Sequence, residues 1–166
     1  MVEGTTDTTH ADFFSLAAGD QQVRDRLAKG ERLRVQTPFR YPGRRGPIVL
    51  DLIPTDDFEV YGPRPVRVSD GGGLIRSLDE QGLDLSIDMI VSQTVVHAVK
   101  EVEGAGIGAG EVYLDSTSES VAVDIWRFLQ LVCEILGLRH SKYKDALVQL
   151  SKRPGSGPDL IGWEGR

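Results

Sequence analysis

Five acidic residues lie in or beside segments that we expect to form a sheet, namely Asp51, Asp56, Asp57, Glu59 and Asp70. Paired carboxylates on neighbouring strands are one way in which nucleases hold magnesium. The usual nuclease pattern also needs a lysine two residues after an acid, and no Asp or Glu of this chain has a lysine there. Asp51 and Asp70 remain candidates for catalysis, but we predict no metal site and no cofactor.

The turn Ser69-Asp70-Gly71-Gly72-Gly73 joins an expected strand to an expected helix. Glycine N–H groups that converge at a helix N-terminus can bind an anion, and Arg67 and Arg76 flank this turn. Alternatively, the turn is structural, and Asp70 accepts hydrogen bonds from nearby backbone N–H groups. We favour the structural interpretation, because a phosphate-binding P-loop needs a Lys-Ser or Lys-Thr pair that is missing here.

Two short basic clusters each contain a tyrosine. One comprises Arg40, Arg44 and Arg45 beside Tyr41, and the other is the segment Lys142-Tyr143-Lys144. Either cluster could contact phosphate, although a solvated loop is the simpler interpretation of both. A net charge of −6 argues against a nucleic-acid binder that works by overall charge. The candidate binding residues are Arg44, Arg45, Arg67, Asp70, Arg76, Lys142 and Lys144.

The other reactive residues indicate no site. His10, His97 and His140 have no partner at the spacing of zinc ligands. Cys133 lies among apolar residues, which predicts a buried and unreactive thiol. The glycine-rich segment 104–110 follows an expected helix and precedes an expected strand, the reverse of a dinucleotide-binding fingerprint. We therefore expect it to be a flexible connection.

Length and composition favour one domain with tails. We expect residues 1–10 to be a disordered tail, residues 11–150 to form a single α+β domain, and residues 151–166 to be a flexible tail. No stretch approaches the roughly 18 apolar residues that a membrane helix needs. A single cysteine fits a reducing compartment. We therefore expect a soluble, cytoplasmic protein that does not bind membranes.

Periodicity predicts the elements that position these residues. Alternation predicts a strand at residues 33–39, and a run of apolar, β-branched residues predicts another at 48–53. Further short strands are expected at residues 66–69 and 111–115. Helical spacing predicts helices at residues 11–18, 20–28, 74–81, 86–103 and 120–138. The expected fold is α+β, with a small antiparallel sheet of three or four strands that helices cover on one face.

The predicted helix over residues 120–138 is apolar around most of its circumference. Its polar residues form one narrow stripe, Asp124, Arg127, Gln130 and Glu134. A helix of this kind is buried on most sides, either inside the domain or in an oligomer interface. The polar stripe is then the solvent-facing edge of the helix or the polar seam of a contact with a partner.

The order of the predicted strands, turns and helices is similar to that of a known protein family. A strand ends in Thr37-Pro38-Phe39, and a later strand runs through Val66 into the Asp70-Gly71 turn and a short helix from Leu74. Over residues 12–138 this order resembles the uncharacterised prokaryotic family catalogued as domain of unknown function 1828. That family occurs in bacteria and in phage or mobile-element contexts, and it has no established activity. Its doubled aspartate is here Ser69-Asp70, so a chemistry that needs both acids does not carry over.

Three functional hypotheses follow. The first is a non-enzymatic protein-interaction or regulatory accessory module of a bacterial or phage system, including defence and mobile-element systems, that binds a protein partner or forms a homo-oligomer. It rests on the missing catalytic patterns and on the apolar helix. The alternative is a nucleic-acid-binding or metal-dependent nucleic-acid-processing domain that uses Asp51, Asp70 and the basic loops. The third is a sensor of small anions at the Asp70 turn.

Overall fold

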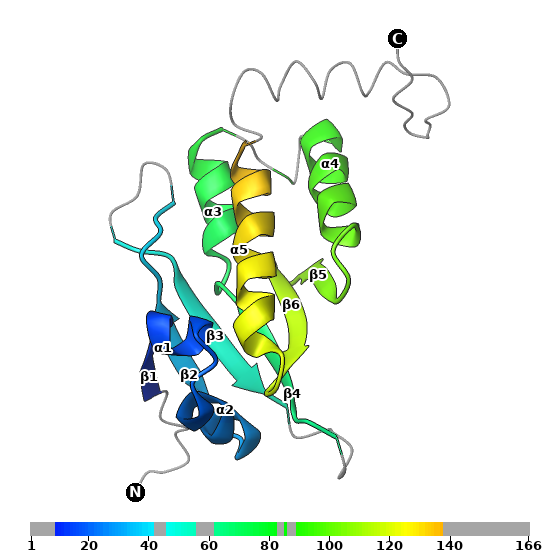
Figure 1. The fold of residues 1–166 in the computed structure, drawn as a ribbon. Coiled ribbons are helices and arrows are strands. Elements are labelled where there is room, and N and C mark those ends of the chain that lie inside the picture. The colour runs from blue at the N-terminus through cyan, green and yellow to red at the C-terminus, as the bar shows by residue number, and fades with distance from the viewer. Residues whose placement is uncertain (1–8, 42–45, 56–61, 83–84, 86–88, 138–166) are drawn as a thin grey trace, which may run out of the picture.

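The computed structural model describes residues 9–41, 46–55, 62–82, 85 and 89–137. These residues form one six-stranded sheet in the order β1-β2-β3-β4-β6-β5, together with five helices (Figure 1). The strands are β1 (Thr9–Asp12), β2 (Leu33–Gln36), β3 (Val49–Pro54), β4 (Pro65–Ser69), β5 (Ala105–Gly108) and β6 (Glu111–Thr117). The helices are α1 (Phe13–Ala17), α2 (Gln21–Ala28), α3 (Gly73–Glu80), α4 (Met89–Lys100) and α5 (Val121–Leu136).

The α+β class is confirmed, but the predicted number of strands is wrong, because two edge strands join the sheet. β1 begins at Thr9, within the range expected to be a tail, and pairs in parallel with β2, so the sheet is mixed. β5 lies in the segment that was expected to be a flexible connection. A tight turn with positive φ at Ala109 and Gly110 connects β5 to β6, and the Tyr113 ring fills the space beside Gly106.

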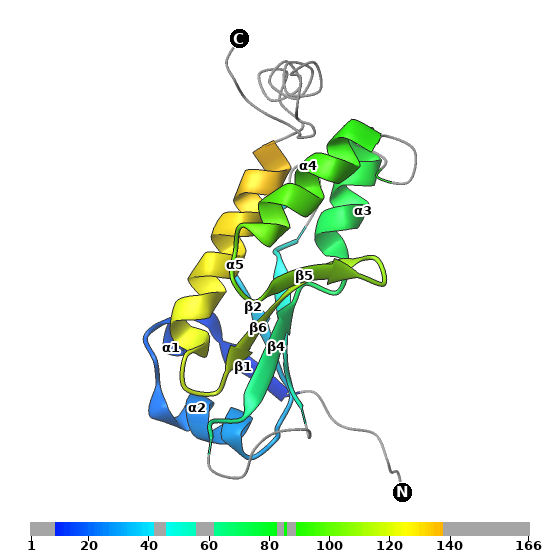
Figure 2. The same cartoon turned by 90° about the vertical axis from the view of Figure 1, so that its right-hand side faces the viewer.

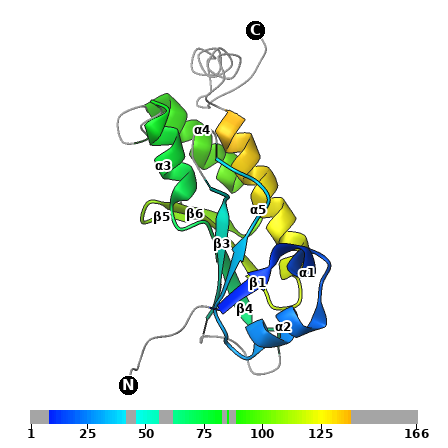
Figure 3. The same cartoon turned by 90° about the vertical axis from the view of Figure 1, so that its left-hand side faces the viewer.

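Alternation along the strands separates a buried face of the sheet from an open one. Leu33, Leu52, Val68 and Leu114 are fully buried on one face. Helices α1, α2 and α5 cover this face, and α3 and α4 pack with α5 beyond one end of the sheet (Figures 1, 2 and 3). The opposite face carries polar side chains, and no described helix lies on it. In the described part of the chain, no helix is long and apolar enough to cross a membrane.

Helix α5 lies inside the described fold, which is one of its two predicted positions, and its exposed side matches the predicted polar stripe only in part. It contacts α1, α3, α4, β4 and β6. Asp124 is buried, whereas Val123, Trp126, Gln130, Cys133 and Glu134 are exposed. Gln130 and Glu134 belong to the predicted polar stripe, whereas Val123, Trp126 and Cys133 each lie one position before a residue of that stripe. The prediction of a buried Cys133 was wrong, because apolar side chains, Cys133 among them, occupy three of the five exposed positions.

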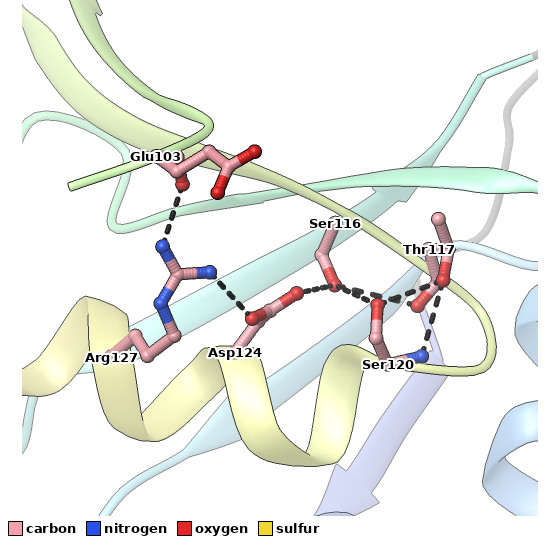
Figure 4. A network of polar contacts seen from close by, with 6 residues as sticks. All are labelled: Glu103, Ser116, Thr117, Ser120, Asp124 and Arg127. Atoms are coloured by element: carbon pink, nitrogen blue, oxygen red, sulfur yellow. Dashed lines mark hydrogen bonds and ion pairs between the residues drawn. The ribbon is translucent and has the colours of Figure 1, made fainter.

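Asp124 is buried because it belongs to a polar network that fastens the first turns of α5 (Figure 4). Its carboxylate accepts hydrogen bonds from Ser116 Oγ at 2.6 Å and from Arg127 Nη1 at 2.8 Å. Arg127 Nη2 also donates to the backbone carbonyl of Glu103 at 2.7 Å. Ser120 N donates to Thr117 Oγ1 at 3.1 Å at the start of the helix. The network thus joins α5 to β6 and to the connection between α4 and β5.

This network predicts a stability cost for Asp124→Ala. The substitution leaves Ser116 Oγ without its carboxylate acceptor and Arg127 without its ion-pair partner, so the free energy of unfolding should fall by about 1–3 kcal/mol. Glu134→Ala is the control, because Glu134 is an exposed acid on the same helix and should change stability by less than about 0.5 kcal/mol. Equal denaturant midpoints for the two variants would refute the structural role of the network.

Candidate functional site

The Asp70 carboxylate is a structural hub at the N-terminus of α3. Asp70 is only 8% exposed. It accepts hydrogen bonds from the backbone N–H of Gly72 at 3.0 Å and of Leu74 at 2.7 Å, and from the Tyr41 hydroxyl. A negative charge at this position also interacts favourably with the helix dipole. The structural interpretation of this turn is therefore confirmed.

The remaining N–H groups of the turn are also bonded within it. Gly71 N donates to Ser69 Oγ at 3.0 Å, and Gly73 N donates to the Asp70 carbonyl at 3.3 Å. Gly73 must lack a side chain, since a Cβ there would lie 2.7 Å from the Tyr41 ring. The position that an anion would occupy at this helix N-terminus is taken by the carboxylate of Asp70 itself. The geometry therefore does not favour an anion site at the turn.

Asp51 and Asp70 do not form a shared site. Asp51 is directly opposite Ser69 in the sheet, on the open face, and its carboxylate pairs with Arg34 Nε at 2.8 Å. The Asp70 carboxylate instead points into the buried contact with Tyr41. Among the described residues, no group of three or more His, Cys, Asp or Glu side chains could hold a metal ion. The other acids of the predicted cluster, Asp56, Asp57 and Glu59, lie outside the described residues.

The described basic candidates already bind groups of the chain itself. Arg67 forms two hydrogen bonds to Asp115, at 2.8 and 3.1 Å, and its guanidinium lies 3.7 Å from the centre of the Tyr113 ring. The hydrogen bonds to Asp115 raise the pKa of Arg67 above its ordinary value. Arg76 Nη1 donates to the Gly71 carbonyl at 3.1 Å. Four other predicted binding residues lie outside the described residues: Arg44, Arg45, Lys142 and Lys144.

A cluster of exposed apolar side chains lies where α1 meets the first turns of α5. We call Phe14, Phe39, Val123 and Trp126 the aromatic patch; their exposed fractions are 67%, 39%, 65% and 43%. Phe13, which is buried, lies beneath them and contacts the rings of Phe14, Phe39 and Trp126 edge to face, with centroids 5.3, 6.1 and 5.5 Å away. The rings of Phe39 and Trp126 also meet edge to face at 6.5 Å.

Three segments far apart in the sequence build the aromatic patch. Asp12 caps α1 by accepting a hydrogen bond from Ser15 N at 2.9 Å, so Phe13 turns inward and Phe14 outward. After β2, the Thr37 hydroxyl accepts a hydrogen bond from Phe39 N at 3.2 Å. This hydrogen bond fixes the backbone of Phe39 beside the patch. Val123 and Trp126 are one turn apart on α5, which contacts α1 (Figure 1).

Sequence reasoning missed the aromatic patch. It assigned Val123 and Trp126 to the buried circumference of α5 and treated Phe14 as part of an apolar helix. The available signal was the spacing of Val123, Trp126, Gln130 and Cys133, which places three apolar residues on one side of the helix with a polar one. Residue type alone could not show that this side faces solvent.

No family model, no curated protein and no solved structure matches this chain. The similarity to domain of unknown function 1828 therefore stays a prediction. The function has to be inferred from the geometry of the chain itself.

The hub at Asp70 predicts coupled stability losses. Asp70→Ala removes the acceptor for two backbone N–H groups and for Tyr41, so the free energy of unfolding should fall by about 2–4 kcal/mol. Tyr41→Phe removes one of the same hydrogen bonds and should cost about 1 kcal/mol. The double variant should lose less than the sum, because the two residues share that bond. Additive losses in urea unfolding, or no loss for Asp70→Ala, would contradict this assignment.

Proposed function

We propose that this protein is a non-enzymatic interaction module that binds a protein partner through the aromatic patch. The observation that carries the proposal is the exposure of Phe14, Phe39, Val123 and Trp126 as one cluster. Exposed apolar clusters in otherwise polar surfaces mark sites of protein interaction. An accessory role in a bacterial or phage system is part of the same proposal and is supported only by the family resemblance.

The energetics of the patch favour a contact with another protein. Covering a large apolar side chain contributes about 1.5–3 kcal/mol relative to leaving it in water. Tryptophan is among the residues that most often dominate the binding energy of an interface. Phe14 and Trp126 are therefore the expected anchors, since both project rings from helices that are fixed to the core.

The patch is also organised before it binds. The buried ring of Phe13 contacts three of the surface rings, so these rings support one another in edge-to-face geometry. Rings that are held in this way lose little conformational freedom when a partner covers them. Exposed charges flank the patch, because Asp12 precedes Phe13 and Arg40 follows Phe39. An apolar centre with a charged rim is the usual composition of a protein interface.

The open face of the sheet supports a nucleic-acid partner less well. Each of the two arginines on the described strands of that face is paired across the sheet, Arg34 with Asp51 and Arg67 with Asp115. A phosphate would have to compete with a carboxylate that already occupies the guanidinium. Binding of a protein through the aromatic patch does not require these arginine–aspartate ion pairs to break.

Photo-crosslinking tests the proposal. We expect a benzoyl-phenylalanine placed at Phe14 to form a discrete adduct with a partner protein in the cells that naturally contain this protein. The same group placed at Met89 is the control, because Met89 is 70% exposed but lies on α4, away from the patch. Trp126→Ala should reduce the yield of the Phe14 adduct about tenfold or more, as expected for an interface anchor.

Two results would oppose the proposal. One is the same set of adducts from Phe14 and from Met89, which would indicate random collisions. The other is a Phe14 adduct whose yield does not change in a folded Trp126→Ala variant, because the contact would then not involve the patch. Circular dichroism of each variant shows whether its fold is intact.

A further inference from the structure

Strand β5 forms one edge of the sheet, and none of the described elements covers that edge. It is the last strand in the order of the sheet, and among the described strands it pairs only with β6. Figure 2 views the molecule from the side of this edge, where β5 lies in front of β6 and β4. The edge is on the other side of the sheet from β1 and α1 (Figure 1).

The register shows which backbone groups of β5 point outward. Asp115 N donates to the Gly104 carbonyl at 2.8 Å, and the pairs that follow in register are Gly106 with Tyr113 and Gly108 with Glu111. In an antiparallel pair, alternate residues bond the neighbouring strand and the residues between them face away. The N–H and C=O of Ile107 therefore point to the free edge, and within the described chain they have no partner.

This edge lacks the features that normally prevent two edges from pairing. Natural sheets protect free edges with charged side chains, prolines or a covering element. β5 is Ala105-Gly106-Ile107-Gly108, which contains neither a charge nor a proline. Ala105 and Ile107 pack toward the core, and the two glycines add no side chain to the other face, where the Tyr113 ring lies beside Gly106. The edge at β1, by contrast, carries the exposed His10 and Asp12.

We infer that β5 pairs antiparallel with β5 of a second copy of this chain, so that two sheets join across a two-fold axis at Ile107. The outward groups of this strand are self-complementary in that arrangement. The Ile107 N–H donates to the Ile107 carbonyl of the second copy, and the Ile107 carbonyl accepts from the Ile107 N–H of that copy in return. An unrelated extended peptide would find glycines in place of side-chain pockets, and such pockets are what make strand addition selective.

The expected dimer is weak, because β5 is short. Stable interfaces bury about 800 Å² on each partner, which is more than a four-residue strand can provide alone. The pairing should therefore increase with protein concentration rather than persist at high dilution. It is independent of the aromatic patch, which remains exposed in such a dimer.

Amide exchange measured by NMR tests the pairing in the unaltered protein. We expect exchange of the Ile107 amide to slow several-fold as concentration rises and the dimer forms in sedimentation velocity. The Gly106 amide is the internal control, because it faces β6 in both states and should not change. Ile107→Pro, which lacks the N–H, should abolish the dimer, whereas Ile107→Val should keep it.

Three results would overturn the inference. They are a monomer at every concentration, a dimer in which the Ile107 amide exchanges as fast as in the monomer, and a dimer that Trp126→Ala removes. If Ile107→Pro fails to fold, the amide measurement on the unaltered protein decides alone. Crosslinking from Phe14 reports separately on the aromatic patch, so the two proposals can fail independently.

Discussion

The hydrogen bonds of the Asp70 carboxylate hold together the point where the sheet meets the helical layer. β4 ends there, α3 begins there, and Tyr41 joins from the segment after β2. A buried carboxylate is tolerated only when its oxygens are bonded, and here two backbone N–H groups and a hydroxyl satisfy them. The contact between Asp70 and Tyr41 also requires glycine at position 73, because the Tyr41 ring occupies the space that a side chain of residue 73 would need. Asp70, which the sequence suggested as a candidate for catalysis or binding, thus accepts hydrogen bonds that stabilise the fold.

The rotation of helix α5 about its axis decides which of its apolar residues are exposed. Its apolar sides fill the space between the sheet and the other helices, and its polar network with Ser116 fixes its rotation. With that rotation, Val123 and Trp126 must face solvent beside Phe14. A fold that only needed a core would place polar residues at these positions. Their exposure is the observation on which the proposed contact with another protein rests.

Much of the fold could be predicted from the sequence, because β2, β4 and β6 alternate between apolar and polar residues, β3 is a short apolar run and α5 has clear helical spacing. β1 and β5 could not, since Thr-His-Ala-Asp and Ala-Gly-Ile-Gly contain few of the side chains that mark strands, and backbone pairing holds both at the edges. The site could not be predicted either. Phe13 and Phe14 are identical neighbours, and only packing makes one buried and the other exposed.

Hydroxyl-radical footprinting tests the interaction surface most directly, by comparing the purified protein with the same protein in the cells that naturally contain it. If a partner covers the aromatic patch, oxidation of Phe14 and Trp126 falls in the cells while oxidation of Met89, which is exposed on α4, stays the same. If Phe14 and Trp126 are oxidised to the same extent in both settings, the patch is not covered and the proposed function is wrong.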